Sequence, residues 1–296
     1  MAAMSKPRNQ ALAVRLRLAG NRPLKKAPVR PSTKGVEGEY LRTLLLYVTA
    51  LRRATREVIL PALPGLLRQA ARERQDSYLD DLQSLIERAM REVSREFPDD
   101  RLAAFAREAA QRTDRFSGSA LAEQIKAIAE IDLHTSTPGL PARIATFTRD
   151  NVELIKSIGT TYHRRIEQIV TENVRIGARA SSPDRPARGI DEDFTELGEV
   201  TERRAALIAR DQVLKFSGEV TRSRQSDLGI SEYIWHNSDD ERVRGNPGGL
   251  YPKARHSHWD REGKVFSWAD PPPDGHPGYA IQCRCWAEPV LDGLLP

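Results

Sequence analysis

Two cysteines, Cys283 and Cys285, stand one residue apart near the C-terminus, and four of the six histidines lie between residues 235 and 285. Thiolates and imidazoles are the ligands that zinc prefers in tetrahedral sites. A disulfide across a single residue is strained, so this pair does not indicate a disulfide framework. The sequence instead predicts a candidate zinc site whose ligands are His258, His276, Cys283 and Cys285, with His236 and His256 as alternates.

The spacing of the cysteine pair leaves a second interpretation open. A Cys-x-Cys pair is less diagnostic of zinc than a Cys-x-x-Cys pair, and the chain has no second pair to complete the ligand set. Residues i and i+2 of a strand share one face, so a regular strand permits a joint metal site and equally permits two thiols that only fill a core. Convergence of the two sulfur atoms with a histidine nitrogen separates the two interpretations.

A charged run, Asp239-Asp240-Glu241-Arg242-Val243-Arg244, precedes these residues. We expect Arg242 to pair with Asp240 or Asp260 beneath aromatic rings, because a guanidinium stacks well on such faces. The rings are those of Trp235, Trp259 and Trp268. The predicted structural cluster is Trp235, Asp240, Arg242, Arg244 and His258.

An active centre of Arg, Asp and His is the alternative role for this region, and it requires a base poised at a substrate cleft. The chain has no Gly-x-Ser-x-Gly elbow, phosphate-binding loop, His-Glu-x-x-His helix or dinucleotide fingerprint. We therefore assign no catalytic residue. A pocket converging on the charged and sulfur-bearing side chains would favour an enzyme, whereas a filled cluster would favour a structural module.

The part of the chain that must position these residues is mainly helical. Upstream of residue 177, apolar side chains recur every three or four residues, which predicts antiparallel amphipathic helices. Prolines and Pro-Gly turns separate them. The expected helices cover residues 41–58, 66–97, 101–113, 121–131 and 147–176.

Serine, proline and arginine dominate residues 178–189, which marks a linker. Beyond it the pattern predicts helices over 193–197 and 202–221 and a strand over 230–236, followed by short strands and long loops. The fold class is thus α+β. Three parts are expected: a basic disordered arm (1–35), a helical domain (36–180) and a small loop-rich α+β domain (189–296).

The net charge of +5 is concentrated in the arm, where nine basic residues occur without an acidic one. Uncompensated basic arms commonly meet nucleic acid through phosphate contacts that are independent of base sequence and sensitive to salt; the alternative is a solvated tail. The candidate DNA-binding residues are Arg15, Arg17, Lys25 and Lys26. The sequence has no apolar run long enough to cross a bilayer and no signal-peptide core, so we expect no membrane association.

The order of motifs in the last hundred residues resembles the phage Mu F-like family of minor head, or head morphogenesis, proteins. The motifs are Arg204-Ala205, Ile208 to Gln212, Trp235, Asp240 to Arg244, His258, Gly263 to Phe266, Pro277-Gly278 and Cys283-Arg284-Cys285. The resemblance covers roughly residues 189–296. Residues 37–40 and 151–158 resemble the helical part of the same family.

This resemblance implies a virion protein that acts by binding during head assembly. Its implied partners are the portal protein and the scaffold or major capsid protein, with double-stranded DNA as a further candidate. Its implied location is the virion head, and the host cytoplasm during assembly. The alternative is an enzyme carried in the head, a nuclease-like or nucleotide-transforming effector with its site in the C-terminal domain.

Overall fold

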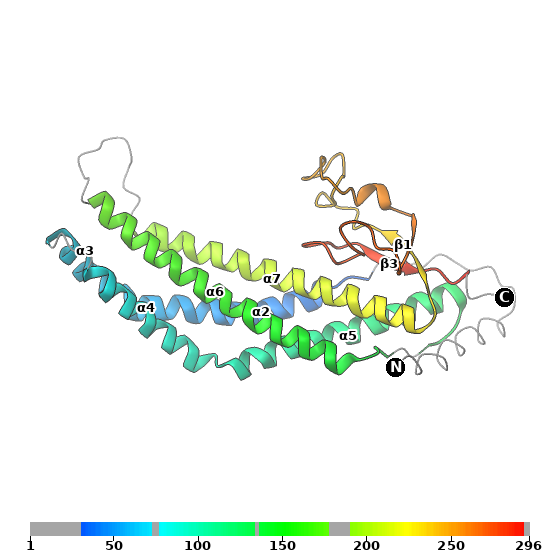
Figure 1. Cartoon of the computed structure of the whole chain (residues 1–296), viewed down its shortest axis with the longest axis horizontal. Coiled ribbons are helices and arrows are strands. Elements are labelled where there is room, and N and C mark those ends of the chain that lie inside the picture. Colours follow the sequence, from blue (N-terminus) through cyan, green and yellow to red (C-terminus); the bar gives the residue numbers. More distant parts are fainter. Residues whose placement is uncertain (1–30, 73–76, 134–135, 178–189, 293–296) are drawn as a thin grey trace. The chain divides into compact units, whose positions relative to one another are not determined.

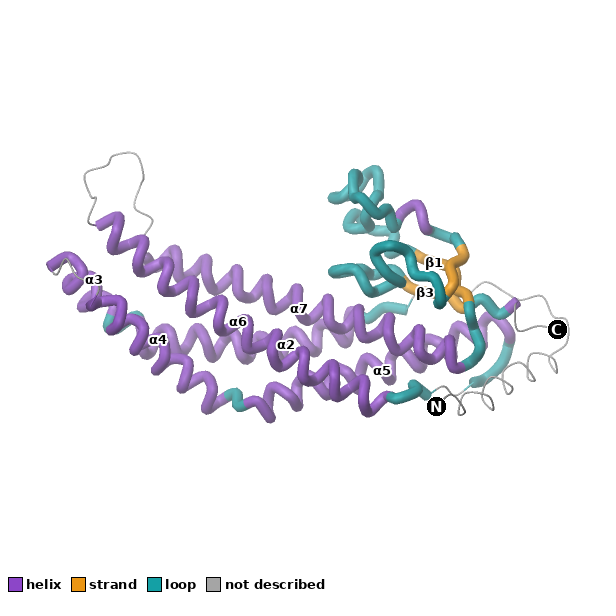
Figure 2. The backbone as a smooth tube through the Cα atoms, in the orientation of Figure 1, coloured by secondary structure: helices purple, strands orange, loops and turns teal. Residues whose placement is uncertain are grey.

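The structure, a computed structural model, describes residues 31–72, 77–133, 136–177 and 190–292. The four candidate DNA-binding residues, Arg15, Arg17, Lys25 and Lys26, lie outside the described residues, as does most of the predicted arm. In the described residues, helices account for most of the chain and the strands are short, as Figure 2 shows. The prediction of a mainly helical N-terminal region followed by a small α+β region is confirmed.

The chain forms two compact units that alternate along the sequence. One unit comprises residues 1–37, 108–147 and 210–296, and the other comprises 38–107 and 148–209. Four long helices contribute residues to both units: α2 (Lys34–Ala54), α5 (Asp99–Ala129), α6 (Leu140–Gly177) and α7 (Ile190–Asp227) (Figure 1). No helix in the described ranges combines the length and apolar character needed to span a bilayer.

In the described residues of the unit 38–107 and 148–209, all regular secondary structure is helical. After α2, a π-helical turn (Thr55–Ile59) leads to α3 (Leu63–Arg72) and α4 (Ser77–Glu96). Buried residues at helical spacing form its core, including Leu44, Val48 and Leu51 of α2 and Ile155 and Ile158 of α6. A buried hydrogen bond of 3.0 Å from the Tyr40 hydroxyl to Asn151 Oδ1 links α2 to α6.

Two helices run through positions where the sequence pattern predicts a break. Residues 101–131 were expected to form two helices, but α5 runs unbroken through Gly118, and α7 likewise runs through Gly198. Each glycine admits an arginine from another helix: a Cβ would lie 3.0 Å from Arg224 Nη2 at Gly118 and 3.2 Å from Arg52 Nε at Gly198. Packing against these side chains outweighs the low helix propensity of glycine.

The other unit contains a three-stranded antiparallel sheet. Strand β1 (Glu232–His236) lies between β2 (Val265–Ser267) and β3 (Trp286–Pro289), giving the order β2-β1-β3. Trp235 pairs with Ala287 across β1 and β3. One face of the sheet builds a core from Tyr233, Trp235, Trp268, Cys283, Cys285 and Ala287. A second apolar cluster joins α5 to the residues after α7, including Ile125, Leu228 and Leu291.

Candidate metal centre

His258 and the two cysteines converge beside the sheet. Nδ1 of His258 lies 3.4 Å from Sγ of Cys283 and 3.4 Å from Sγ of Cys285. The three donor atoms all lie within 4.8 Å of one another. The exposed fractions of the three residues are 2%, 4% and 8%, so little of each side chain is exposed.

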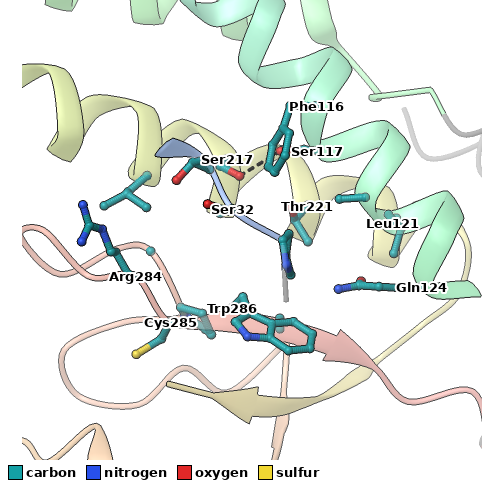
Figure 3. Close-up of a pocket in the computed structure, with 18 of the residues that line it drawn as sticks. Ser32, Phe116, Ser117, Leu121, Gln124, Ser217, Thr221, Arg284, Cys285 and Trp286 are labelled. Carbon is teal, nitrogen blue, oxygen red and sulfur yellow. Dashed lines mark hydrogen bonds between the residues drawn. The ribbon is translucent and has the colours of Figure 1, made fainter. Parts of the chain in front are cut away.

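The segment 282–286 aims both sulfurs the same way because its side chains alternate. Cys285 directly precedes β3. Figure 3 shows a separate cavity that is lined by residues of α5 and α7, and the sulfur of Cys285 points away from it. The side chain of Arg284 points to the other side, where its Nη2 donates a 3.3 Å hydrogen bond to Glu37 Oε2. The preceding turn is held by a 3.0 Å hydrogen bond from the Gln282 backbone N–H to Asp211 Oδ1 on α7.

Backbone and side-chain contacts orient the imidazole of His258. Its backbone N–H donates a 2.9 Å hydrogen bond to the carbonyl of Arg244, and its Nε2 lies 2.7 Å from Asp274 Oδ2. A carboxylate accepts hydrogen bonds, so Nε2 carries the proton and the lone pair of the neutral ring sits on Nδ1, toward the sulfurs. The Trp235 ring meets the imidazole edge to face, with 5.2 Å between ring centroids.

An arginine completes the surroundings of this histidine. Arg261 Nη2 forms a 2.6 Å ion pair with Asp274 Oδ1, and the Arg261 guanidinium lies 4.8 Å from the centroid of the Trp235 ring. Burial raises the pKa of Asp274, but hydrogen bonds from His258 and Arg261 outweigh burial and lower it. The carboxylate therefore stays ionised beside the imidazole, as an orienting group behind a metal ligand requires.

The thiols have unequal acidity. Hydrogen bonding from Cys285 is the largest cause that lowers the pKa of Cys283, and His258 adds to it. Burial raises the pKa of Cys285, and the neighbouring Cys283 raises it further. Burial lowers the pKa of His258, but hydrogen bonds to Cys283 and Asp274 outweigh burial and raise it. The pair thus holds one thiolate readily, and a cation between the sulfurs would be needed to hold two.

The other predicted ligand lies elsewhere. The Tyr233 hydroxyl lies 2.9 Å from His276 Nδ1, and the imidazole packs against Trp268 with 4.8 Å between ring centroids. Burial lowers the pKa of His276 to about 4. Among the alternates, His236 lies between two glutamates, with Nδ1 and Nε2 each 2.7 Å from the carboxylates of Glu262 and Glu288. Among the described residues, neither histidine belongs to the three-residue donor group.

The predicted structural cluster is brought together only in part. Trp235 and His258 are in contact, and Arg244 supports His258 through its carbonyl. Arg242 is exposed and forms no ion pair among the described residues; Asp240 Oδ1 accepts a 2.9 Å hydrogen bond from its backbone N–H. The guanidinium over Trp235 belongs to Arg261 and not to Arg242.

Arg261 and Asp274 were not identified from the sequence. Arg261 ends a single 3₁₀ turn (Trp259–Arg261), and Asp274 lies in the proline-rich loop that follows β2. Neither position belongs to a periodic pattern. The proximity of Asp274 to His258 along the chain, in a segment rich in chemically active side chains, is the only sequence signal that points to it.

A cleft opens beside the candidate centre. It has a volume of about 610 Å³, and His258, Cys283 and Cys285 all contribute to its lining. Five basic side chains, Arg210, Arg242, Arg244, Lys253 and Arg284, line it together with one acidic side chain, Asp240. Burial lowers the pKa of Arg210, and the neighbouring charge of Arg284 lowers it further. Glu37 pairs with Arg210 and Arg284, so the excess of positive charge rests mainly on Arg242, Arg244 and Lys253, and it makes the cleft attractive to anions.

Comparison with known proteins shows the family to which the chain belongs. The sequence model described as Phage Mu protein F like protein matches residues 117–288, which is more than half of the chain. The chain belongs to this Mu F-like family. The matched region includes much of α5, all of α6 and α7, the three described strands except the last residue of β3, and all three donor residues. It begins upstream of residues 189–296, where the sequence motifs were recognised.

The Mu F-like chain also matches an uncharacterized protein of Haemophilus influenzae strain Rd. The two are 35% identical over 158 residues, which is 53% of this chain and 31% of the relative. The chain therefore spans about a third of that relative's length. No solved structure matches the chain. Family membership supports a phage head-related protein.

Proposed function

We propose that this Mu F-like chain is a minor head protein that acts in head morphogenesis by binding the portal protein within the procapsid. The observation that carries the proposal is a docking face around the cleft, within the region that matches the family. This docking face consists of Leu250, Tyr251, Tyr279 and Ile281, whose exposed fractions are 57%, 54%, 69% and 60%.

The docking face has the composition of a protein interface. Leu250, Tyr251 and Ile281 line the cleft, and Tyr279 lines a neighbouring hollow that also includes Ile281, so the four side chains are contiguous. Exposed apolar residues that are grouped mark interaction sites, and tyrosine and arginine are enriched where binding energy concentrates. The basic residues of the cleft suit an acidic surface on the portal protein.

The test is binding of the purified full chain to assembled portal protein, with scaffold and major capsid protein assayed in parallel. Replacing both Tyr251 and Ile281 by serine should weaken portal binding at least about tenfold, since loss of one hot spot costs more than about 1.4 kcal/mol. Val200→Ser is the matched control, because Val200 is 47% exposed and lies outside the docking face. Unchanged binding by the double variant, or equal loss in the control, would contradict the proposal.

An enzyme carried in the head is the second candidate function, and one observation favours it. The cleft converges on His258 and both cysteines, and its arginines would hold a phosphate-bearing substrate. A nuclease-like or nucleotide-transforming activity should be lost in His258→Asn while portal binding is retained. Absence of turnover of single-stranded DNA, double-stranded DNA and nucleotides by the metal-supplemented chain would exclude these reactions.

A further inference from the structure

We propose that the chain binds one zinc ion through Nδ1 of His258 and Sγ of Cys283 and Cys285, with a fourth coordination position open to the cleft. Tetrahedral zinc with bonds of about 2.3 Å to sulfur and about 2.0 Å to nitrogen separates those two ligand atoms by about 3.5 Å. Both Nδ1 to Sγ distances are 3.4 Å. Both nitrogen-to-sulfur separations thus already match edges of a zinc tetrahedron, and the two sulfurs lie within 4.8 Å of each other, against about 3.8 Å in such a tetrahedron.

A single hydrogen bond from His258 does not account for both sulfur contacts. One imidazole nitrogen donates or accepts one good hydrogen bond, so it explains only one of the two sulfur contacts. Two buried thiols that merely filled a core would have no reason to share the same nitrogen. A cation bound by all three atoms explains why both cysteines turn to His258 while the intervening Arg284 turns to Glu37.

The surroundings of His258 match those of a metal-bound histidine. Histidine ligands commonly donate their second ring N–H to a carboxylate, which fixes the ring and directs the free lone pair at the metal. Asp274 Oδ2 provides this contact at 2.7 Å, and Arg261 holds the other carboxylate oxygen at 2.6 Å. Arg261 in turn lies over Trp235, so the orientation is anchored in the core of the sheet.

The fourth position follows from the number of donors. Zinc takes four ligands, and sites with three protein ligands keep the remaining position for water or another exogenous ligand. In the described part of the chain the donor group holds three residues, and His276 is engaged with Tyr233. All three donors line the cleft, whose walls carry Arg210, Arg242 and Arg244. The fourth ligand is therefore water, which an oxyanion drawn by these arginines can displace.

The first experiment measures zinc in the purified full chain and its retention after removal and readdition. Elemental analysis should find one zinc per chain, and the demetallated chain should take up one equivalent. Cobalt in place of zinc should give the absorption of sulfur-to-metal charge transfer together with the intense bands of a tetrahedral ion. Absence of stoichiometric uptake, or a cobalt spectrum without sulfur-to-metal absorption, would overturn the assignment.

Variants separate this site from a nucleophilic cysteine. A Cys283, His258 and Asp274 arrangement acting in catalysis requires one thiol, whereas the metal site requires both, so Cys285→Ser should lose stoichiometric zinc as Cys283→Ser does. Asp274→Asn keeps all three ligands and should bind zinc about 10- to 100-fold more weakly. His256→Asn is the control, because His256 lies outside the donor group and its variant should bind zinc normally. Full zinc binding by Cys285→Ser would refute the ligand set.

The open position has its own test. Inorganic phosphate added to the cobalt-loaded chain should shift the bands of the tetrahedral ion, and substitution of Arg242 by glutamine should raise the phosphate concentration required. A spectrum that phosphate leaves unchanged would show that the fourth position is closed.

Discussion

At the scale of single residues, His236 at the end of the central strand β1 gives a test that is independent of the metal centre. Its ring lies between Glu262 and Glu288 and stacks on Trp286 with 4.4 Å between centroids. Burial lowers the pKa of His236, but hydrogen bonds to Glu288 and Glu262 outweigh burial and raise it. The folded state therefore holds this proton more tightly than the unfolded chain does.

A raised pKa fixes the sign of the pH dependence. The stabilisation is complete below the unfolded pKa of about 6.5 and is lost as pH rises through the higher folded pKa. The difference in free energy of unfolding between the native chain and His236→Gln should be largest near about pH 6 and should shrink toward about pH 9. Urea unfolding across this range measures it. His256→Gln is the control, and a His236 difference that grows with pH would contradict the prediction.

The residues of the centre differ in how far the sequence reveals them. Cysteine, histidine and tryptophan are rare, so their concentration between residues 235 and 286 is visible without a structure. Asp274 and Arg261 are common residue types in irregular segments, and only the fold shows that they meet His258. The same holds for Glu37, a buried helical residue whose carboxylate meets Arg284 near the other end of the chain.

At the scale of elements, α7 and the loop before the cysteines approach each other closely. A Cβ on Gly218 would lie 2.6 Å from the carbonyl oxygen of Pro277, and one on Gly278 would lie 2.8 Å from the carbonyl oxygen of Leu214. The φ of Gly278 is 85°, which L side chains rarely adopt. Two glycines facing each other thus let the helix and the loop pack backbone to backbone.

Gly218→Ala should separate α7 from this loop. Backbone atoms cannot move aside as a flexible side chain can, so the cost should be about 1–3 kcal/mol in the free energy of unfolding. Gly35→Ala is the matched control, because a Cβ there meets nothing within 4 Å, and it should be neutral or slightly stabilising. Thermal unfolding followed by circular dichroism compares the two. Equal melting temperatures would show that the close approach of α7 and this loop does not affect stability.

A buried ion pair joins α5 to α7 in the same unit. Arg224 Nη2 lies 2.6 Å from Asp114 Oδ1, which also accepts a 2.5 Å hydrogen bond from Thr137. Burial lowers the pKa of Arg224, although Asp114 opposes that change. Asp114→Leu should cost about 3–5 kcal/mol, because it leaves the guanidinium buried without its counter-charge.

Two variants check the origin of that cost. Combining Asp114→Leu with Arg224→Met should recover most of the lost stability, since no charge then remains buried. Glu219→Gln removes the exposed partner of Arg143 and should cost less than about 1 kcal/mol. Chemical unfolding of the three variants gives the comparison. If Asp114→Leu alone were as stable as the double variant, the prediction would be wrong, because water would then reach Arg224 and solvate its charge.

The elements themselves are predictable where periodicity is strong and unpredictable where packing overrides local preference. The stripe of Val152, Ile155 and Ile158 identifies α6, and aromatic and β-branched residues identify β1. The helices α5 and α7 extend through glycines because Arg224 and Arg52 occupy the space that side chains would fill. The partners β2 and β3 have three and four residues, too few to give an alternating signal.

At the scale of the whole molecule, the two compact units do not correspond to consecutive parts of the sequence. The unit boundaries after residues 37, 107, 147 and 209 each fall inside a helix, namely α2, α5, α6 and α7. Composition does not change within a continuous amphipathic helix, so no local signal marks such a boundary. The composition shift at residues 178–189 is visible because serine and proline interrupt the helical pattern between α6 and α7.

The charge distribution of the whole chain leads to the last prediction, that residues 1–30 bind double-stranded DNA. This segment carries eight of the 46 basic residues and no acidic residue. Each phosphate contact contributes about 0.9 to the slope of log K against log salt concentration, so deleting residues 1–30 should reduce that slope by up to about 7. Deletion should leave the melting temperature within a few degrees, because no core residue of the described chain is removed.

A charge-removing variant separates the effect of charge from that of length. Substituting glutamine at Arg15, Arg17, Lys25 and Lys26 keeps the length and should remove about half of the slope, whereas an effect of length alone would leave the slope unchanged in this variant. Equal salt slopes for the full and shortened chains, measured by fluorescence anisotropy with duplex DNA, would remove the nucleic-acid role of the arm.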